Sequence, residues 1–416
     1  MIRLNRISIE HSVYVLLVIM LLLMTFSDAE CESSFSALGH GWMEGTSSAR
    51  SAGMGQLGLT LPDTVCLNIT NPAMWSGSAT ARLGLQGDVY RTYIDDNTGT
   101  DVSDQFGFTG IAMAIPIGKT FFGVSLSSFT RLNYKWESTD IAAGDWSSTK
   151  ESFDGRGGLT LGNVGFSFPY GERWRFGISG RAILGKTEQS WKIDFPDIAS
   201  NNATRAFSDR YVGGGVSLSC HWNNQQNWSA GAMLISPISV FVERQELVKS
   251  EYTVLFDSTW DVDNNYELPI GIAFGLAKRI SRDKFGAEVS WYGWDMVEEP
   301  TLLTKDFANA LKISTGWEHS PEYQPYYPLW EKLTWRGGLY MQQHYSKGNT
   351  DHQALNYAMT FGFGLPYNDG KSRVDAAFEF GLRGSKDDDG AAERYAGITL
   401  SINHSDLWFV QRRKQH

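Results

Sequence analysis

The stretch Phe121–Trp136, FFGVSLSSFTRLNYKW, decides the fold of this chain. Successive side chains of a strand point to opposite faces. One parity carries Phe122, Val124, Leu126, Leu132, Tyr134 and Trp136, and the other carries Ser125, Ser127, Arg131, Asn133 and Lys135. The 16 residues exceed the roughly 5–6 of a usual soluble strand and the about 9–11 that a tilted strand needs to cross a bilayer. The stretch therefore predicts a membrane-crossing ribbon with aromatic residues at both ends.

Many further segments alternate in the same way. They are residues 79–93, 104–116, 155–169, 174–192, 206–222, 227–242, 264–280, 283–294, 309–319, 332–345, 355–366, 372–384 and 391–402. About fourteen antiparallel strands can close into a barrel that leaves no unpaired edge in lipid. We predict an all-β fold, a transmembrane antiparallel β-barrel. The alternative is a soluble double-layered sheet, but its solvent face would be charged, whereas the second face here is often Gly, Ala and Ser.

Short and long connections alternate along the chain. Tight turns are expected at 116–120, 170–173, 281–283 and 368–371, and long polar loops at 95–103, 138–154, 196–205, 243–264, 296–307 and 386–392. This alternation is typical of a barrel with turns at one rim and loops at the other. Residues 319–332 form a long connection on the turn side, which leaves the strand register across 296–332 open.

The composition fits strands in which apolar residues alternate with polar ones and do not form long apolar runs. Aromatic residues make up 13% of the 416 residues, yet the mean hydropathy is −0.27. The net charge of −10 and the pI near 5.3 argue against a nucleic-acid partner.

The N-terminus has the features of a secretory signal. Arg3 and Arg6 precede the apolar run Val13–Phe26, and Ser27-Asp28-Ala29 supplies small residues for cleavage after Ala29. Residues 1–29 are therefore predicted to be a signal peptide; an uncleaved anchor helix is the alternative. A lipoprotein at Cys31 is disfavoured by Glu30. Export would permit a Cys31–Cys66 disulfide, and two free thiols are the alternative.

Residues 30–78 are rich in Gly and small residues and do not alternate. A barrel of about fourteen strands encloses more space than side chains alone fill, so this segment is expected to plug the barrel of residues 79–416, which ends in a short basic tail. A disordered periplasmic tail is the alternative. Asn71-Pro72-Ala73 ends the segment, and Pro72 either turns the chain into the wall or marks an element that moves when ligand passes.

Several motifs resemble those of a known family. Ser48–Trp75, SARSAGMGQLGLTLPDTVCLNITNPAMW, contains an R-x-A-G-M-G element and an N-P-A motif. Together with Ile115–Lys119, Glu267–Pro269, Trp335–Gly338, Gly362–Pro366 and Leu407–Lys414, these motifs resemble the FadL-like outer-membrane transport family, including its PorV-like branch. Two departures are the absence of a terminal aromatic residue and of a clear counterpart to a fatty-acid carboxylate site.

The resemblance implies an outer-membrane channel of a Gram-negative-type (diderm) bacterium. It would take up hydrophobic or amphipathic molecules similar to long-chain fatty acids, with the ligand displacing the plug at Asn71, Pro72 and Ala73. The PorV-like branch implies an alternative, a shuttle or scaffold for secreted proteins of type IX secretion. The expected partners are therefore outer-membrane lipid, a hydrophobic ligand and, in the alternative, secretion proteins.

Candidate ligand contacts are of two kinds. Arg131 and Arg336 lie on the inward parity and could meet an anionic head group; the alternative is that lumen charges pair and lock wall and plug together. The apolar candidates lie in or near the predicted loops, and they are Phe256, Trp260, Leu302 and Phe307.

No catalytic or cofactor site is predicted. The eight His are scattered without metal-ligand spacing, and no nucleophile has an evident base, so the chain is not expected to be an enzyme or to hold a metal. Asp387-Asp388-Asp389 could bind calcium, but a solvated loop tip is the favoured interpretation.

Overall fold

The computed structural model describes residues 33–406 apart from 46–47, 77, 79, 98, 144–145, 196–201, 263–265, 298–305, 323, 325 and 348–351. The predicted signal peptide, Cys31, Leu302 and the basic tail from residue 407 lie outside the described residues. Cys66 is a buried free thiol.

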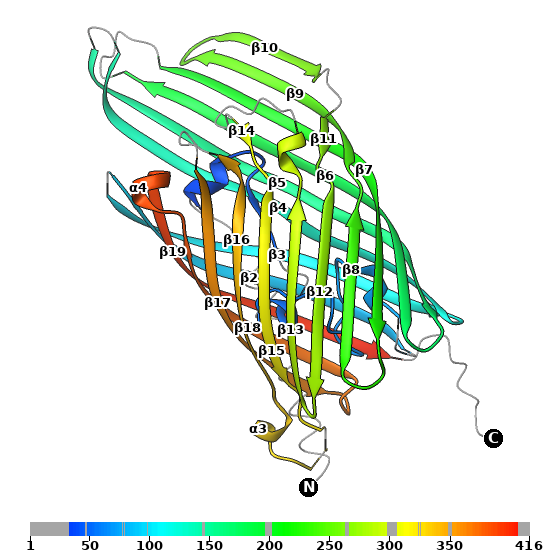
Figure 1. Ribbon diagram of the computed structural model, residues 1–416. Coiled ribbons are helices and arrows are strands. Elements are labelled where there is room, and N and C mark those ends of the chain that lie inside the picture. Colours follow the sequence, from blue (N-terminus) through cyan, green and yellow to red (C-terminus); the bar gives the residue numbers. More distant parts are fainter. Residues whose placement is uncertain are drawn as a thin grey trace, which may run out of the picture.

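The wall is a closed antiparallel β-barrel of 14 strands, as predicted (Figure 1). The first six are β2 (Ala81–Asp96), β3 (Thr100–Ile117), β4 (Thr120–Ala143), β5 (Trp146–Tyr170), β6 (Trp174–Asp194) and β7 (Ala203–Asn223). Three strands are interrupted: β8 (Trp228–Ile235) with β9 (Ile238–Ser250), β10 (Val254–Asp261) with β11 (Tyr266–Leu268) and β12 (Gly271–Ile280), and β14 (Asp306–Phe307) with β15 (Ala310–His319). The rest are β13 (Asp283–Tyr292), β16 (Thr334–Lys347), β17 (Gln353–Tyr367), β18 (Ser372–Arg383) and β19 (Ala391–Asp406). Pairing of β19 with β2 closes the ring.

The described helices are short. They are η1 (Ser34–Ala37), α2 (Ala49–Ala52) and η2 (Pro72–Met74) before the wall, and η3 (Trp294–Met296), α3 (Leu329–Lys332) and α4 (Lys386–Asp389) in connections. No helix in the described ranges has the length and apolar character needed to cross a membrane. The N-terminal segment, residues 33–76 as far as they are described, runs inside the ring of strands (Figure 1). It includes the two-residue strand β1 (Trp42–Met43).

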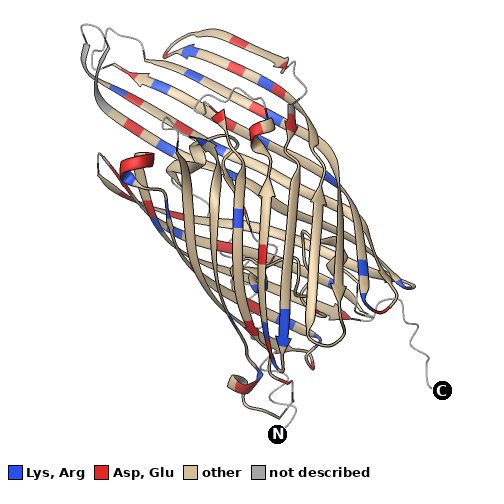
Figure 2. Ribbon diagram, in the orientation of Figure 1, with Lys and Arg blue, Asp and Glu red and all other residues tan. Residues whose placement is uncertain are grey.

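Alternation sets what faces outward. On β12, for example, Ile272, Phe274 and Leu276 are all about half exposed, whereas Ala277 is buried. Charged residues gather toward the two ends of the barrel, with fewer on the strand middles between (Figure 2). An outward apolar band between polar ends is the pattern of a membrane-embedded barrel.

Three of the loops predicted from sequence are mainly strand, and for one of them, 243–264, most residues lie in β9 and β10. β2 and β3 leave only residues 97–99 between them, and β4 and β5 extend to Ala143 and from Trp146, where loops at 95–103 and 138–154 were expected. The tips of β2 and β3 carry polar residues on both faces, such as Asp95, Asp96, Thr100 and Asp101, so they lack the apolar parity that marks the rest of the wall. We call this rim the loop end and the opposite rim, with the 118–119, 171–173 and 368–371 turns, the turn end.

The stretch Phe121–Trp136 departs from its prediction at Phe129. Ser128 pairs with Thr160 and Thr130 with Leu159, so Phe129 is an extra residue, a β-bulge. A bulge shifts the parity of everything beyond it. Leu132 and Tyr134, predicted to face outward with Leu126, are instead buried, at 1% and 3% exposure. The prediction of one apolar face along the whole stretch is therefore wrong beyond Phe129.

Candidate functional site

The barrel wall is split between β3 and β4. The two strands pair only from Gly110–Ser127 to Ile117–Thr120, while β4 continues to pair with β5 as far as Ala143. The rest of β3, Thr100–Thr109, pairs with β2 alone. Thr109 and Phe129 are extra residues in their ladders, and both stand where the strands part. We call this opening in the hydrogen-bond ladder the split.

The N-terminal segment covers the edge of β4 that β3 leaves free. Trp42 and Met43 pair with Arg131 and Thr130, and the Glu44 amide donates to the Phe129 carbonyl at 2.9 Å. Gly41 has φ +98°, and a Cβ there would collide with the Arg131 backbone, so only glycine allows this close approach. Unpaired backbone groups are costly in lipid, and the segment satisfies them.

Arg131 bridges the split. Its Nη1 lies 3.3 Å from Asp88 Oδ1 on β2, and its Nε lies 3.3 Å from Glu44 Oε1 of the N-terminal segment. The sequence predicted that Arg131 meets an anionic ligand. The structure places two protein carboxylates at its guanidinium, which fits the alternative, a charge that ties wall and N-terminal segment together.

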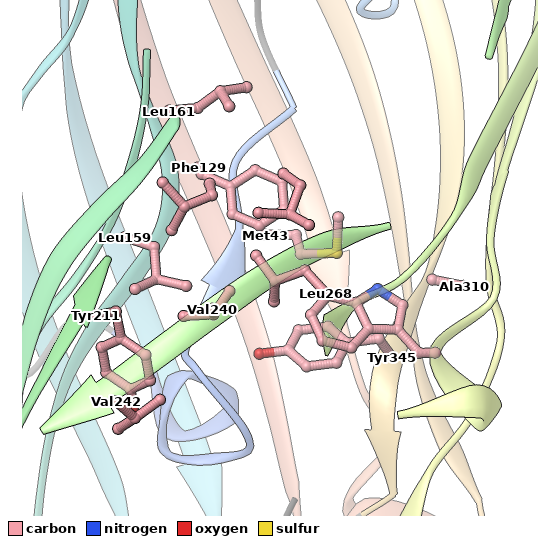
Figure 3. Close-up of a cluster of buried hydrophobic side chains, with 13 residues drawn as sticks. Met43, Phe129, Leu159, Leu161, Tyr211, Val240, Val242, Leu268, Ala310 and Tyr345 are labelled. Atoms are coloured by element: carbon pink, nitrogen blue, oxygen red, sulfur yellow. The ribbon is translucent and has the colours of Figure 1, made fainter. Parts of the chain in front are cut away.

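A large apolar cluster covers one side of the lumen (Figure 3). Its buried members come from β4, β5, β6, β7, β9 and other strands, and they are Phe129, Leu159, Leu161, Ile183, Tyr211, Ile238, Val240, Val242, Leu268, Trp294, Ala310 and Tyr345. Met43 of β1 packs on it, as does the half-buried Phe307. The Trp294 and Tyr345 rings stack with centroids 4.1 Å apart. We call this the apolar wall.

A cavity of about 160 Å³ lies against the apolar wall. Apolar side chains at its boundary include Met43, Phe129, Leu161, Met233 and Ile235. Four charged side chains also line it, and they are Glu44, Arg181, Glu288 and Lys312. We call this space the apolar cavity; mainly apolar walls with few polar groups are typical of small-molecule sites.

Glu44 belongs to the N-terminal segment and pairs with Arg131, and the segment also binds two of the wall charges, Glu288 and Lys312. The Glu288 carboxylate accepts hydrogen bonds from the amides of Gly58 and Leu59, both at 2.7 Å, and from the Thr60 amide and hydroxyl. Lys312 donates to the Gln56 side chain. The segment thus holds β13 and β15 through polar contacts at the cavity edge.

Arg181 differs from these two charges. It is 6% exposed on β6, its Nε has no hydrogen-bond partner, and no described residue forms an ion pair with its guanidinium. A buried charge without a partner is strongly unfavourable. Arg181 lies on the inward parity in the sequence, but it was not singled out, because parity does not show which cations find a carboxylate.

A cluster of ion pairs joins the N-terminal segment to the turn end of the wall. Its members, the turn-end cluster, are Arg50, Asp63, Lys284, Glu318, Arg336, Arg373 and Asp375. Arg50 Nε lies 2.8 Å from Glu318, and Arg373 Nη2 lies 2.8 Å from Asp63. Burial alone would raise the pKa of Asp63, but Arg373 and Arg50 outweigh it and hold this pKa well below its usual range.

Arg336, the second predicted ligand contact, is fully buried in this cluster. Its Nε lies 3.0 Å from Glu318 and its Nη1 2.7 Å from Asp375. As with Arg131, carboxylates of the protein already occupy the positions that an anionic ligand would take.

Asn71-Pro72-Ala73 lies at the point where the N-terminal segment approaches the wall. Asn71 Oδ1 and Ser219 Oγ both accept from the Ala73 amide at 3.0 Å. A Cβ at Gly177 of β6 would collide with Pro72 and Ala73, so the segment is seated directly on the strand backbone. These contacts are those of a fixed turn, the simpler of the two interpretations of Pro72.

The predicted apolar candidates do not gather in one place. Phe307 packs on the apolar wall. Phe256 and Trp260 lie on β10, which pairs only with β9, and both are exposed. Leu302 lies outside the described residues.

Comparison with known proteins places the chain among related barrels. The BamG family model matches residues 9–415, and no curated protein matches. The solved toluene transporter TbuX of Ralstonia pickettii is 13% identical with a TM-score of 0.61, covering 86% of this chain and 98% of its own. A FadL homologue of Pseudomonas aeruginosa is 12% identical with a TM-score of 0.59, covering 88% and 99%.

A mutant of the TodX monoaromatic hydrocarbon channel, 18% identical, gives a TM-score of 0.63 and covers 87% of this chain and 99% of its own. At these identities the likeness establishes the fold. The expected resemblance to FadL-like barrels is confirmed at that level, while the PorV-like branch stays a prediction. The chain belongs to the BamG family and has the fold of the FadL-type channels.

Proposed function

We propose that this protein is an outer-membrane channel of a Gram-negative-type bacterium for the uptake of hydrophobic or amphipathic small molecules. The observation that carries the proposal is the apolar cavity, enclosed between the apolar wall and the N-terminal segment inside a barrel with an outward apolar band. The solved channels of similar fold include proteins described as toluene transporters and a monoaromatic hydrocarbon channel, which supports a hydrophobic ligand.

The route that we propose leaves the lumen sideways. The turn end is blocked by the turn-end cluster and by the seating of Pro72 and Ala73 on β6. The split, in contrast, has no strand ladder across it and is covered by β1 and the Arg131 ion pairs. A ligand in the apolar cavity would displace the Met43–Gly45 stretch and leave between β3 and β4 into the membrane lipid.

Arg181 supports an amphiphile with an anionic end, such as a long-chain fatty acid. A carboxylate at the guanidinium would make charge-assisted hydrogen bonds and would offset the unfavourable burial of an unpaired cation. Arg131 and Arg336 are less suited because protein carboxylates already neutralise them.

The test compares dodecane and dodecanoate binding to the purified full-length protein in detergent. We expect the wild type to bind both, and Arg181→Met to lose about tenfold or more of its dodecanoate affinity, as expected for a hydrogen bond between charged groups, while dodecane binding is unchanged. Arg156→Met, at an exposed position on β5, is the matched control. Failure of the wild type to bind either probe would refute the proposal.

A second candidate is a scaffold for secreted proteins, as in the PorV-like branch. The β9–β10 hairpin favours it, because Tyr252, Val254 and Leu255 expose more than half of their surface there. Replacing residues 251–262 by a short Gly-Ser linker should then reduce surface display of secreted proteins and leave dodecane binding intact. If neither changes, the hairpin has no such role.

A further inference from the structure

A second, smaller cavity lies on the side of the lumen opposite the apolar wall. It measures about 30 Å³, and polar residues line most of it, among them Tyr90, Gln105, Tyr340, Gln342, Glu379 and Tyr395. We call it the polar chamber. Met43, Glu44, Gly45, Gln56 and Gln342 line both this chamber and the apolar cavity, so only this thin layer of side chains separates the two spaces.

A carboxylate surrounded by hydroxyls forms the rear of the polar chamber. Glu379 accepts hydrogen bonds from Tyr340 at 2.5 Å and Tyr395 at 3.0 Å, with the Tyr90 hydroxyl at 3.4 Å. No Lys, Arg or His in the described ranges lies within ion-pair distance of it. The tyrosines hold the carboxylate in place, and its charge can strengthen one more hydrogen bond.

On the opposite side of the polar chamber, the side-chain amide of Gln105 is a hydrogen-bond donor that has no acceptor among the described residues. Gln105 of β3 is 7% exposed, and its Nε2 has no hydrogen-bond partner among the described residues. The same holds for both amide atoms of Gln86 and for the Thr109 hydroxyl, each buried on the inner face of β2 or β3. Buried polar groups are nearly always hydrogen-bonded in native proteins, so an unmet donor in a cavity indicates a missing polar partner.

These unmet groups follow the free part of β3. Gln105 and Thr109 belong to the stretch that pairs with β2 alone, and Gln86 pairs with Gly110 where the split begins. Glu44, which lines both spaces, also binds Arg131 at the split. The polar chamber therefore borders the split on its β3 side, as the apolar cavity does on its β4 side at Phe129.

The donor and acceptor pattern selects one ligand chemistry. The chamber needs a group that donates to Glu379 and accepts from Gln105. A carboxylate cannot donate and an ammonium cannot accept, whereas a hydroxyl or an amide does both. The volume of about 30 Å³ suits one or two such groups, since about 10–15 Å³ holds a water-sized group.

We propose that the polar chamber binds the uncharged hydroxyl-bearing end of an amphiphile whose apolar part lies in the apolar cavity. This inference rests on the proposed function, and it names a ligand class beyond hydrocarbons and fatty acids. The apolar wall would contact the apolar part of such a ligand, and Gln105 and Glu379 would bind its polar end.

The test uses 1-monododecanoylglycerol and dodecane as probes on the full-length protein in detergent. The wild type should bind the glyceride several-fold more tightly than dodecane. Gln105→Leu should lose about 3- to 10-fold in glyceride affinity, the range for one neutral hydrogen bond, with dodecane affinity unchanged. Glu379→Gln, which keeps the shape but removes the charge, should also weaken the glyceride selectively. Gln245→Leu, exposed on β9, is the matched control.

The outcomes separate this inference from the proposed function. If dodecane does not bind the wild type, the channel proposal itself fails. If dodecane binds but the glyceride has no advantage, or if Gln105→Leu and Glu379→Gln both keep it, then the polar groups are merely hydrated and the inference is overturned. A heat-dependent shift in gel mobility shows that each variant is folded, and the second variant decides if the first does not fold.

Discussion

The two halves of β4 both alternate apolar and polar residues in sequence, but they differ in their pairing partners and in the side chains that face the lumen. From Phe121 to Ser127 the strand pairs with β3 on one side and β5 on the other, and its inward residues include the small Ser125 and Ser127. From Phe129 to Asn133 the N-terminal segment replaces β3, and the large Phe129 and Leu132 face inward. The extra residue Phe129 marks the change, because beyond it the opposite set of side chains faces the lumen.

The largest effect should follow from detaching the N-terminal segment, which pairs with the second half of β4. Gly41→Ala introduces a Cβ that collides with the Arg131 backbone in addition to the positive-φ strain, so we expect residues 33–45 to leave the β4 edge. Limited proteolysis of the purified protein should then cut this segment. Gly118→Ala, also at positive φ but with no atom within 4 Å, is the control and costs only about 1 kcal/mol. Equal protease resistance of both variants would contradict the pairing described for β1.

Replacing one inward phenylalanine in each half of β4 by alanine should distinguish the two halves. Phe121 packs with Trp75 and Ala114, and Phe129 packs with the apolar wall. Either change to Ala should destabilise the barrel by about 3–5 kcal/mol. Only Phe129→Ala should alter dodecane affinity, measured in detergent, because only Phe129 lines the apolar cavity. An equal change in dodecane affinity for both variants would contradict the inference that Phe129, and not Phe121, lines the apolar cavity.

The ion pairs of Arg131 provide a smaller and more specific effect. Arg131→Met leaves the buried Asp88 and the Glu44 carboxylate without their cation, which should destabilise the folded protein by about 2–4 kcal/mol. Cysteine labelling of a Thr109→Cys variant, at a buried position where the strands part, should become faster from the membrane side as the split opens. Arg91→Met, which breaks an exposed pair with Asp104, should leave the labelling rate unchanged. Unchanged labelling in Arg131→Met would remove this residue from the closure of the split.

The smallest expected effect is the loss in acid of the Asp63 ion pairs that attach the N-terminal segment at the turn end. Because the pKa of Asp63 is depressed in the folded protein by Arg373 and Arg50 against the effect of burial, its contribution is present above the ordinary value of 3.8 and is lost as pH falls below it. The unfolding midpoint of the wild type should begin to drop below about pH 5, roughly one unit above that value, and should keep dropping below pH 3. Asp63→Asn should be less stable at pH 7 and less sensitive to acid; an identical acid dependence would exclude Asp63 as its source.

The sequence predicts the wall well and the site only in part. Alternation in segments such as Leu268–Leu276 marks a strand wherever one face meets lipid, so the barrel could be found from parity alone. Phe129 could not be recognised as a bulge, because apolar and polar residues continue to alternate across it and the register shift shows only in the pairing of Ser128 and Thr130 with β5. Parity also fails at the strand tips, where both faces meet water.

The lumen charges show the same limit. Arg131, Arg181 and Arg336 all look alike as inward cations in the sequence. Their partners come from distant parts of the chain, Asp88 and Glu44 for Arg131, and Glu318 and Asp375 for Arg336. Which arginine remains available for a ligand is therefore a property of the tertiary structure.

The seam between β19 and β2 constrains the order of assembly. It joins the last strand to the first, while the N-terminal segment inside the ring contacts strands from β4 to β19. A segment held by this many strands has to be enclosed while the sheet is still open, since it cannot be threaded into a finished ring through the turn-end cluster. We therefore expect the N-terminal segment to be enclosed before the last strand pairs with the first, and closing of the seam, which is the pairing of longest range, to be a slow step of folding.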